Sequence, residues 1–508
     1  MTFSLNTQTI VAVIGAGSMG AGIAQLAAQS GHEVRLHDAQ AGAAAAALTR
    51  IAAELDGAVK RGKLSSEDRD GVLGRIATAG TLESLAGCGL VVEAIVERLD
   101  VKQSVFRALE SVLADDAVFA TNTSSISITA VAQGLRHPRR LIGWHFFNPA
   151  TRMKLVEVIA GVETDPALVA AMHALAKAWG KTSVDAPNAP GFIVNRVARP
   201  YYAEALRLLA EGLAPVPAID RLMREAGGFA LGPFELMDLI GLDVNLSVTE
   251  SVFQATAYDP RYAPHLIQQE LVRSGRFGRK TGRGFHDYRP GATPPVAVTV
   301  AAAADAPATL GHAADCGLLK PLLDRLQTAG VHVAPADGLP PETLAFGAVR
   351  IGLTDGCTAS ERGAALGGTS LLLLDLARDF STTTTLGATA NGSGRAHLGA
   401  LAALLAIADI ALIELADIAG LALMRTVCCL ANEAADVMTW TGTRPADIDT
   451  AMRLGTAYPV GPLAWADVIG PARVATVLAN LQAHYGEARY RRAPALSMRQ
   501  HAGSLFHG

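Results

Sequence analysis

The feature that most constrains the fold of this 508-residue chain is a glycine-rich turn close to its N-terminus. The pattern G-x-G-x-x-G follows the apolar run TIVAVIG and opens an alanine-rich stretch, so it stands between a candidate strand and a candidate helix. The first glycine makes a tight turn, the second lets the backbone approach a pyrophosphate, and the third lets helix and strand pack closely. The helix start also offers free N–H groups and a positive dipole end to phosphates. We therefore expect a dinucleotide to bind at Gly15, Gly17, Ser18, Met19 and Gly20.

The second candidate strand, Glu33–Asp38, ends in an acidic residue. A carboxylate at this place accepts hydrogen bonds from the ribose hydroxyls and would repel a 2′-phosphate. Asp38 therefore indicates NAD rather than NADP as the cofactor. The alternative interpretation is a glycine-rich turn followed by an aspartate that caps a helix. The context, the spacing and the acidic residue together favour the cofactor site.

Short β-branched runs alternate with helical stretches from Thr9 to Val184. Such alternation predicts a parallel sheet covered on both faces, and we assign this Rossmann-type α/β domain to residues 1–187. After Pro190–Gly191 the candidate strands stop, and residues 188–289 are expected to form a helical domain. The candidate strands are Thr9–Gly15, Glu33–Asp38, Leu90–Ile95, Val118–Thr123, Leu141–Phe147, Lys154–Ile159 and Thr182–Val184.

The tail of the chain repeats this helical segment at one fixed offset, which is the separation between Gly191 and Gly420. Many matches at one offset indicate a duplicated helical unit, and we assign its second copy to residues 417–508. Residues 290–416 are expected to form a linker and a small α/β segment, in which no chemical motif is visible. The matched pairs include Gly191 and Gly420, Arg196 and Arg425, Glu204 and Glu433, Asp220 and Asp449, and Gly241 and Gly470.

Composition excludes several classes of function. The net charge of −4 argues against nucleic acid as the main partner. The most apolar stretch, Leu398 to Met424, is interrupted by three acidic residues, so we interpret it as a buried helix and expect no membrane span. Five scattered cysteines without a CxxC motif give no metal site and no disulfide framework, and they suit a reducing cytosol. Because the N-terminus lacks a basic leader, we expect a cytoplasmic protein.

A histidine and a glutamate occupy matching places in two adjacent strand-like runs, His145 in LIGWHFFNP and Glu157 in KLVEVI. If these runs form an antiparallel hairpin centred near Thr151, the two side chains oppose each other with Cβ atoms about 4.5–5.5 Å apart. Such a carboxylate fixes the imidazole tautomer and stabilises the imidazolium, as a base for oxidation of a secondary alcohol requires. The alternative is a half-buried histidine balanced by a glutamate for structural reasons, and the spacing alone does not decide between the two.

Six segments of the chain match a known family. They are VAVIGAGSMGAGIAQ, VVEAIVERLDVKQSVF, TNTSSISIT, GWHFFNPATRMKLVEVI, PGFIVNRV and GRKTGRGFHDY, and they cover residues 9 to 288 in the family's order. On these segments the chain resembles the (S)-3-hydroxyacyl-CoA dehydrogenases, in particular their long bacterial form with a duplicated C-terminal domain. The weaker repeat extends the likeness from Leu415 to about Gly486. The implied fold is a Rossmann-type domain followed by all-α domains of the 6-phosphogluconate-dehydrogenase-like type.

The resemblance implies a reaction and roles for particular residues. The reaction is the reversible, NAD-dependent oxidation of a 3-hydroxyacyl-CoA to a 3-oxoacyl-CoA, in fatty-acid or aromatic-acid (phenylacetate-type) degradation, with the acyl-CoA bound between the sheet domain and the first helical domain. His145 would be the base and Glu157 its orienting carboxylate, while Ser124 and Asn195 would hydrogen-bond the reacting oxygen or the base.

The resemblance also places Glu97, Lys102 and Asn122 beside the cofactor. Without it, Glu97 and Lys102 would be an ordinary solvated pair. Basic residues around Arg61 and Lys63 would meet the phosphates of coenzyme A or simply mark a charged helix end.

The second helical copy departs from the family pattern. Asn195 of the first copy falls on Met424 of the second, which ends in SMRQHAGSLFHG where the first carries GRFGRKTGRGFHDY. We therefore expect one active site per chain and a structural second copy, in either a homodimer or a pseudo-dimeric monomer. Two rival functions stay open. One is a dehydrogenase of a free hydroxy acid or sugar acid on the same fold; the other is a retired dehydrogenase, which the presence of all four catalytic residues disfavours.

Overall fold

The computed structural model describes residues 3–508, which group into two compact units. The first unit runs to Arg196 and includes residues 450–456, and the second contains residues 197–449 and 457–508. The first unit is built on an eight-stranded sheet with the order β3-β2-β1-β4-β5-β6-β7-β8. Its strands are β1 (Val11–Ile14), β2 (Val34–His37), β3 (Ile76–Ala79), β4 (Leu90–Glu93), β5 (Val118–Thr121), β6 (Leu141–Phe146), β7 (Leu155–Ile159) and β8 (Thr182–Ala186).

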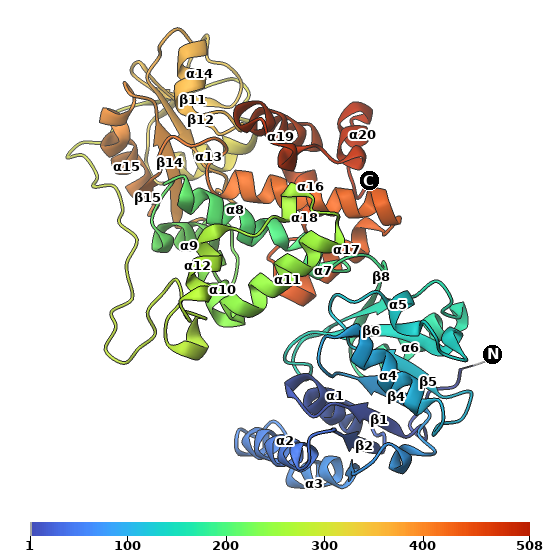
Figure 1. The fold of residues 1–508 in the computed structure, drawn as a ribbon. Coiled ribbons are helices and arrows are strands. Elements are labelled where there is room, and N and C mark those ends of the chain that lie inside the picture. The colour runs from blue at the N-terminus through green and yellow to red at the C-terminus, as the bar shows by residue number, and fades with distance from the viewer. Residues whose placement is uncertain (1–2) are drawn as a thin grey trace. The chain divides into compact units, whose positions relative to one another are not determined.

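Helices flank this sheet (Figure 1). β1, β4 and β5 are buried along their whole length, as expected of parallel strands that are covered on both faces. All neighbouring strands run parallel except β6 and β7, which form an antiparallel pair. The helices are α1 (Ser18–Gln29), α2 (Ala43–Lys60), α3 (Ser66–Gly74), α4 (Leu99–Leu109), α5 (Ile128–Ala132), α6 (Pro166–Ala178) and α7 (Val194–Val197).

The predicted Rossmann-type sheet is confirmed, and all seven candidate strands are present with slightly different bounds. The eighth strand, β3, was missed. It has four residues, IATA, of which the middle two are exposed. So short a run, with only its two ends buried, gives little apolar periodicity to find.

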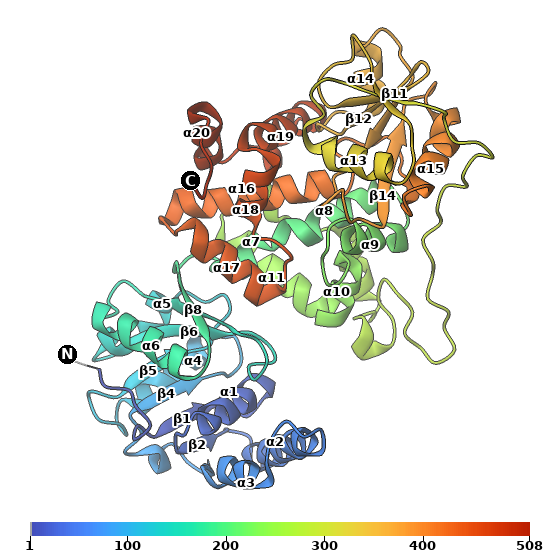
Figure 2. The same cartoon turned by 180° about the vertical axis from the view of Figure 1, so that it is seen from behind.

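The second unit combines helices with a second sheet (Figure 2). This sheet has seven strands in the order β10-β9-β11-β12-β13-β14-β15: β9 (Leu310–His312), β10 (Val333–Pro335), β11 (Thr343–Phe346), β12 (Val349–Leu353), β13 (Leu371–Leu374), β14 (Thr385–Ala390) and β15 (Ala411–Glu414). The helices around it are α13 (Lys320–Thr328), α14 (Ala359–Ala365) and α15 (Leu398–Ala406). The other helices are α8 (Arg199–Ala210), α9 (Val216–Glu225), α10 (Pro233–Ile240), α11 (Leu242–Ala255), α12 (Leu266–Arg273), α16 (Leu423–Thr441), α18 (Pro462–Ile469), α19 (Pro471–Tyr485) and α20 (Pro494–Ala502). The helix α17 (Pro445–Thr456) begins in the second unit, and its residues 450–456 are grouped with the first.

One prediction for this region is wrong. The apolar stretch Leu398 to Met424 is not a single buried helix but holds α15, the strand β15 and the start of α16. The helix ends because Asp409 takes a left-handed conformation, with φ = 56°. The β-branched Ile410 and the following ALIE then extend beside β14. Such short apolar runs are ambiguous between helix and strand when only the sequence is read.

The duplication reaches further than the helices. β12, β13, β14 and β15 pair in the pattern parallel, antiparallel, parallel, and β5, β6, β7 and β8 pair in the same pattern. The N-terminal caps of the helices also correspond. Ser127 caps α5 and Thr358 caps α14, and the separation of these two residues is nearly the offset of the helical repeat. The second sheet therefore contains a shortened copy of the second half of the first.

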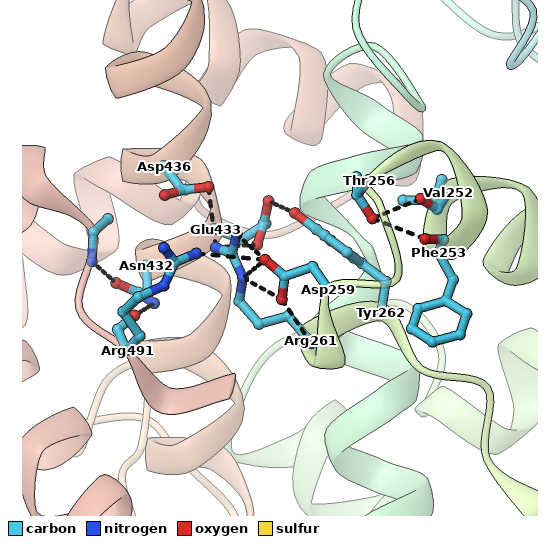
Figure 3. Close-up of polar contacts among 11 residues, drawn as sticks. Val252, Phe253, Thr256, Asp259, Arg261, Tyr262, Asn432, Glu433, Asp436 and Arg491 are labelled. Atoms are coloured by element: carbon cyan, nitrogen blue, oxygen red, sulfur yellow. Dashed lines mark hydrogen bonds and ion pairs between the residues drawn. The ribbon is translucent and has the colours of Figure 1, made fainter. Parts of the chain in front are cut away.

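The two helical copies contact each other reciprocally within the second unit. Figure 3 shows one half of this contact, where the Tyr262 hydroxyl donates to the Glu433 carboxylate and Arg261 forms an ion pair with the same group at 3.3 Å. In the other half, the Tyr490 hydroxyl donates to the Glu204 carboxylate at 3.1 Å. Glu433 is the counterpart of Glu204 at the offset of the repeat, and Tyr490 is the counterpart of Tyr262 with a shift of a single position. This exchange of equivalent contacts is the signature of a two-fold interface, here inside one chain.

The end of the second copy retains a histidine–aspartate contact of the first copy, although the two sequences do not align there at the offset of the repeat. In the first copy, His286 Nε2 lies 2.8 Å from Asp220 Oδ2, and the backbone N–H of His286 donates to Asp238. In the second copy, His507 Nε2 lies 2.8 Å from Asp449 Oδ2. Phe506–His507 therefore takes the place of Phe285–His286. The apparent departure at the C-terminus is a deletion that shortens the offset between the two copies.

The His286–Asp220 pair predicts a pH dependence of stability. Burial alone would lower the pKa of His286 from 6.5, but the hydrogen bond and charge of Asp220 raise it. Burial also raises the pKa of Asp220. Both shifts favour the protonated folded state, so the pair stabilises most below about pH 6.5 and loses this contribution as the pH rises. In urea unfolding we expect the free energy of unfolding of wild type to exceed that of His286→Gln by more at pH 6 than at pH 8.5. His501→Gln, at an exposed site, is the control, and an equal difference at both pH values would contradict the argument.

Among residues 3–508, none of the helices combines the length and apolar character that a membrane crossing requires.

Candidate active site

The glycine-rich turn has the geometry of a pyrophosphate cradle. Gly15 adopts φ = 99°, and a Cβ there would lie 2.5 Å from the carbonyl oxygen of Ala94. A Cβ on Gly20 would lie 1.8 Å from the carbonyl oxygen of Gly15, so both positions require glycine. A Cβ on Gly17 would meet nothing within 4 Å, which leaves the open approach that a pyrophosphate needs. Gly17 is the N-cap of α1 and has no side chain to satisfy the first N–H groups, and Ser18 and Met19 form the first turn.

Asp38 lies directly after β2 and is tied to this turn. Its Oδ2 accepts a hydrogen bond from the N–H of Ala16 at 2.7 Å, and its Oδ1 accepts from the N–H of Gln40 at 2.8 Å. These bonds orient a half-buried carboxylate beside the cradle. This is the place from which an acidic residue reaches ribose hydroxyls. The residues of the cradle therefore fit a dinucleotide.

His145 and Glu157 oppose each other across the antiparallel pair β6–β7, so the predicted register is confirmed. His145 Nδ1 lies 2.7 Å from Glu157 Oε2, and the glutamate is fully buried. Because a carboxylate only accepts hydrogen bonds, the proton on this side belongs to Nδ1, and Nε2 is the nitrogen that can receive another proton. The histidine side chain is 5% exposed and packs against the rings of Phe147 and Phe192, with ring centroids 4.6 and 5.7 Å away.

The other oxygen of Glu157 is held by backbone N–H groups at the start of α7. Ile193 and Val194 each donate to Oε1 at 3.0 Å. Sequence reasoning missed this contact, because backbone donors leave no mark in the residue types. The backbone N–H groups thus fix Oε1 of the carboxylate, while Oε2 holds the imidazole.

Ser124 and Asn195, both predicted site residues, lie close to each other. Asn195 follows Val194 in α7, and its Nδ2 lies 3.5 Å from the backbone carbonyl oxygen of Ser124. The N–H of Ser124 donates to Glu97 Oε1 at 2.8 Å. The segment after β5 is therefore anchored on one side by Glu97 and meets α7 on the other.

Glu97 and Lys102 are not a solvated pair. Lys102 is 1% exposed, and its ammonium contacts Glu93 Oε1 at 2.7 Å and Glu97 Oε2 at 3.2 Å. Partial burial raises the pKa of Glu97, but Lys102, the Thr123 hydroxyl and the Ser124 N–H lower it on balance. The fully buried Glu93 also accepts from the Thr121 hydroxyl at 2.7 Å. Sequence reasoning overlooked Glu93, although a carboxylate that ends an apolar strand is a signal that could have identified it.

Asn122 links this network to the histidine strand. Its Oδ1 accepts from the N–H of Phe146, next to His145, at 2.8 Å. Of the predicted cofactor residues, Glu97 and Asn122 thus accept hydrogen bonds from the backbone at Ser124 and next to His145, and Lys102 pairs with Glu97. Their contact with the cofactor stays a prediction.

A polar cavity of about 600 Å³ lies between α1, α2 and the segment after β6. Its lining includes three cationic residues, Arg61, Lys63 and Arg152, and one carboxylate, Glu54, so cations are in excess. Such a group suits an anion with several phosphates.

A parallel sheet with a dinucleotide cradle, and a buried histidine–carboxylate pair on the same sheet, define a nicotinamide-dependent dehydrogenase. Comparison with known families agrees with this class. The 3-hydroxyacyl-CoA dehydrogenase NAD binding domain matches residues 10–189, and the C-terminal domain of the same family matches residues 191–288 and again 412–506. The reduced Rossmann-fold domain of 3-hydroxybutyryl-CoA dehydrogenase matches residues 351–418. The chain belongs to the 3-hydroxyacyl-CoA dehydrogenase family.

Relatives that match nearly the whole chain and relatives that match only its first part are both found. The chain is 41% identical over 502 residues to the 3-hydroxyadipyl-CoA dehydrogenase of Escherichia coli, covering 98% of both. The crystal structure of a 3-hydroxybutyryl-CoA dehydrogenase from Escherichia coli covers 98% of this chain and 99% of its own, with a TM-score of 0.89 and 40% identity. The probable 3-hydroxybutyryl-CoA dehydrogenase of Bacillus subtilis is 40% identical over 278 residues, which are 96% of its length but 55% of this chain. Short relatives therefore lack the second copy.

Proposed function

We propose that the chain oxidises 3-hydroxyacyl-CoA thioesters to 3-oxoacyl-CoA reversibly, with His145 as the base. The observation that carries this proposal is the 2.7 Å contact between His145 Nδ1 and Glu157, which leaves Nε2 as the nitrogen that can accept the proton of a substrate. The relatives that match nearly the whole chain are named for 3-hydroxyadipyl-CoA and 3-hydroxybutyryl-CoA.

In the proposed mechanism, His145 Nε2 removes the proton of the 3-hydroxyl group, and Glu157 stabilises the imidazolium that forms. Bound NAD supplies the acceptor for the hydride that leaves the same carbon. Ser124 and Asn195 stabilise the oxygen as it becomes a carbonyl. Phe147 and Phe192 exclude water from the base. In the reverse direction His145 returns the proton.

We assign the phosphates of coenzyme A to the cavity with Arg61, Lys63 and Arg152, which offers three cations in the same unit as the base. The natural acyl group is proposed to be short, either neutral or ending in a carboxylate. The second type would serve the breakdown of aromatic acids, and the first the breakdown of fatty acids. A cytoplasmic location is proposed as well, supported by five cysteines that are all free thiols.

The test is absorbance-followed oxidation of NADH with acetoacetyl-CoA and, in parallel, with 3-oxoadipyl-CoA. Turnover with either thioester supports the proposal, and the ratio of the two kcat/KM values identifies the preferred acyl end. NADPH in place of NADH should be a much poorer reductant, because the carboxylate that we propose to bind the ribose hydroxyls, Asp38, would repel a 2′-phosphate. Failure of both thioesters in a folded chain that binds NADH would instead favour a dehydrogenase of a free hydroxy acid, tested with acetoacetate.

We further propose that the chain is a monomer in which the second copy occupies the face that a partner would cover. The reciprocal pairs Tyr262–Glu433 and Tyr490–Glu204 already complete a two-fold interface. Light scattering during gel filtration should therefore give a mass near 52.7 kDa. A stable mass of about twice this value at micromolar concentration would contradict the proposal.

A further inference from the structure

A left-handed turn precedes the N–H groups that hold Glu157. Gly191 has φ = 73° and Phe192 has φ = 49°, so two consecutive residues occupy the region that L side chains avoid. The turn directs the N–H groups of Ile193 and Val194 toward one oxygen of Glu157. Phe192 is 1% exposed, so a bulky non-glycine residue is kept in this conformation inside the protein. Backbone strain of this kind persists only where the surroundings enforce it.

The second copy keeps the same turn at the same offset along the chain. Gly420 has φ = 79° and Leu421 has φ = 55°. The N–H groups of Ala422 and Leu423 donate to Asp375 Oδ2 at 3.0 and 2.7 Å, and the N–H of Met424 donates to Oδ1 at 2.9 Å. In both copies the turn therefore closes on a buried carboxylate.

The carboxylates differ in their place on the sheet. Asp375 directly follows β13, and its N–H donates to the carbonyl of Gly387 on β14. The antiparallel pair β13–β14 matches the pair β6–β7. When the two registers are aligned, Asp375 falls at the place of His145, and Gly387 falls at the place of Glu157. The second copy has thus lost both members of the pair, and a new carboxylate from the neighbouring strand reaches the turn. The second copy therefore keeps the turn and a carboxylate bound to it, although it lacks the histidine–glutamate pair.

We infer that the turn Gly191–Phe192 is a positioning element for the reaction, an anion-binding nest that fixes Glu157 and through it His145. Two aligned N–H groups form a concave site for an anionic oxygen, and bonds to an ionised acceptor are stronger than neutral ones. The nest occupies Oε1 and leaves Oε2 for the imidazole. Gly191 is a positioning residue because it makes the turn without touching the reacting atoms. This inference rests on the proposed function.

The second copy supplies the matched control. Gly191→Ala puts a side chain at φ = 73°, and Gly420→Ala puts one at φ = 79°. A Cβ on Gly420 would approach Arg425 Cβ and Leu481 Cδ2 at 3.0 Å, so the control variant is expected to be destabilised as well. We expect Gly191→Ala to lower kcat at least tenfold with the Kd for NADH within twofold, and Gly420→Ala to keep kcat within twofold. Gly191→Asn should retain more activity than Gly191→Ala, since asparagine tolerates the left-handed region, and it replaces Gly191→Ala if that variant does not fold.

Two readouts separate positioning from a general structural role. In a Glu157→Gln background, Gly191→Ala should lower kcat less than twofold further, because the turn acts through Glu157. The Nδ1–H proton resonance of His145, assigned by its loss in His145→Gln, should shift in Gly191→Ala and stay in place in Gly420→Ala. Equal loss of kcat in both glycine variants, or independent effects of Gly191→Ala and Glu157→Gln, would overturn the inference. If wild type turns over no CoA thioester, the proposed function fails, and the proton resonance alone decides for or against the nest.

Discussion

Replacing His145 by glutamine is expected to lower kcat for NADH oxidation with acetoacetyl-CoA by about 10²–10⁴-fold, the range that general acid–base catalysis supplies. Glutamine keeps a polar side chain of similar reach opposite Glu157, but it cannot carry the proton that the reaction transfers. The Kd for NADH, measured by fluorescence titration, should stay within twofold, because the glycine cradle and Asp38 are untouched.

The control for this variant is His173→Gln. His173 lies on α6 of the same unit and pairs with Ser183 and Asp185 near the surface, with distances of 2.7 Å to each. We expect its kcat to equal that of wild type. Retention of a tenth or more of wild-type kcat by His145→Gln would remove His145 from the role of base. Loss of NADH binding would instead show that the substitution disturbs the sheet.

The largest loss of stability is expected from Arg425→Met, at about 3–5 kcal/mol in the free energy of unfolding, the usual cost of breaking a buried ion pair. The Arg425 side chain is fully buried, and its Nε contacts Glu204 Oε2 at 2.7 Å while its terminal nitrogens contact Glu211 at 2.9 and 3.0 Å. Burial raises the pKa of Glu204, but Arg425 and Arg207 outweigh it and lower the pKa to about 2. Methionine would therefore leave a buried charge without its main partner.

Two comparisons make this prediction specific. Arg444→Met removes an arginine whose side chain is 75% exposed, and it should change stability by no more than about 0.5 kcal/mol. The double variant Arg425→Met, Glu204→Gln should recover part of the loss, because the buried charge is gone as well. Denaturant unfolding of the four proteins is the measurement. An Arg425→Met loss no greater than that of Arg444→Met would contradict the structural role of this pair between the two copies.

Most of the N-terminal sheet was predictable because its strands are short, apolar and separated by helices of ordinary length. The register of β6 and β7 followed from one condition, a symmetric hairpin between His145 and Glu157, which the structure satisfies. What escaped prediction was held by groups without a sequence pattern, such as the backbone N–H donors of Ile193 and Val194. The division of the chain at residues 187, 289 and 416 stays a prediction.

The helical part of the duplication could be found from the sequence, whereas its strands could not. The helical copies share glycines, prolines and aspartates at turns and caps, where few other residues serve, so their fixed offset is visible in the sequence. The strands share only apolar character, which many residues provide. Thus β12 to β15 could be matched to β5 to β8 only from their pairing. The Phe506–His507 end was concealed by a change of offset.

The central claim is that this two-copy chain holds one dehydrogenase site. The stoichiometry of NADH binding tests this claim most directly. A fluorescence titration at a chain concentration well above Kd should reach its end point at one NADH per chain, and the bound nucleotide should be oxidised completely when acetoacetyl-CoA is added. An end point of two NADH per chain would contradict the single site. So would bound NADH that no 3-oxoacyl-CoA oxidises, because the cradle and His145 would then not serve one reaction.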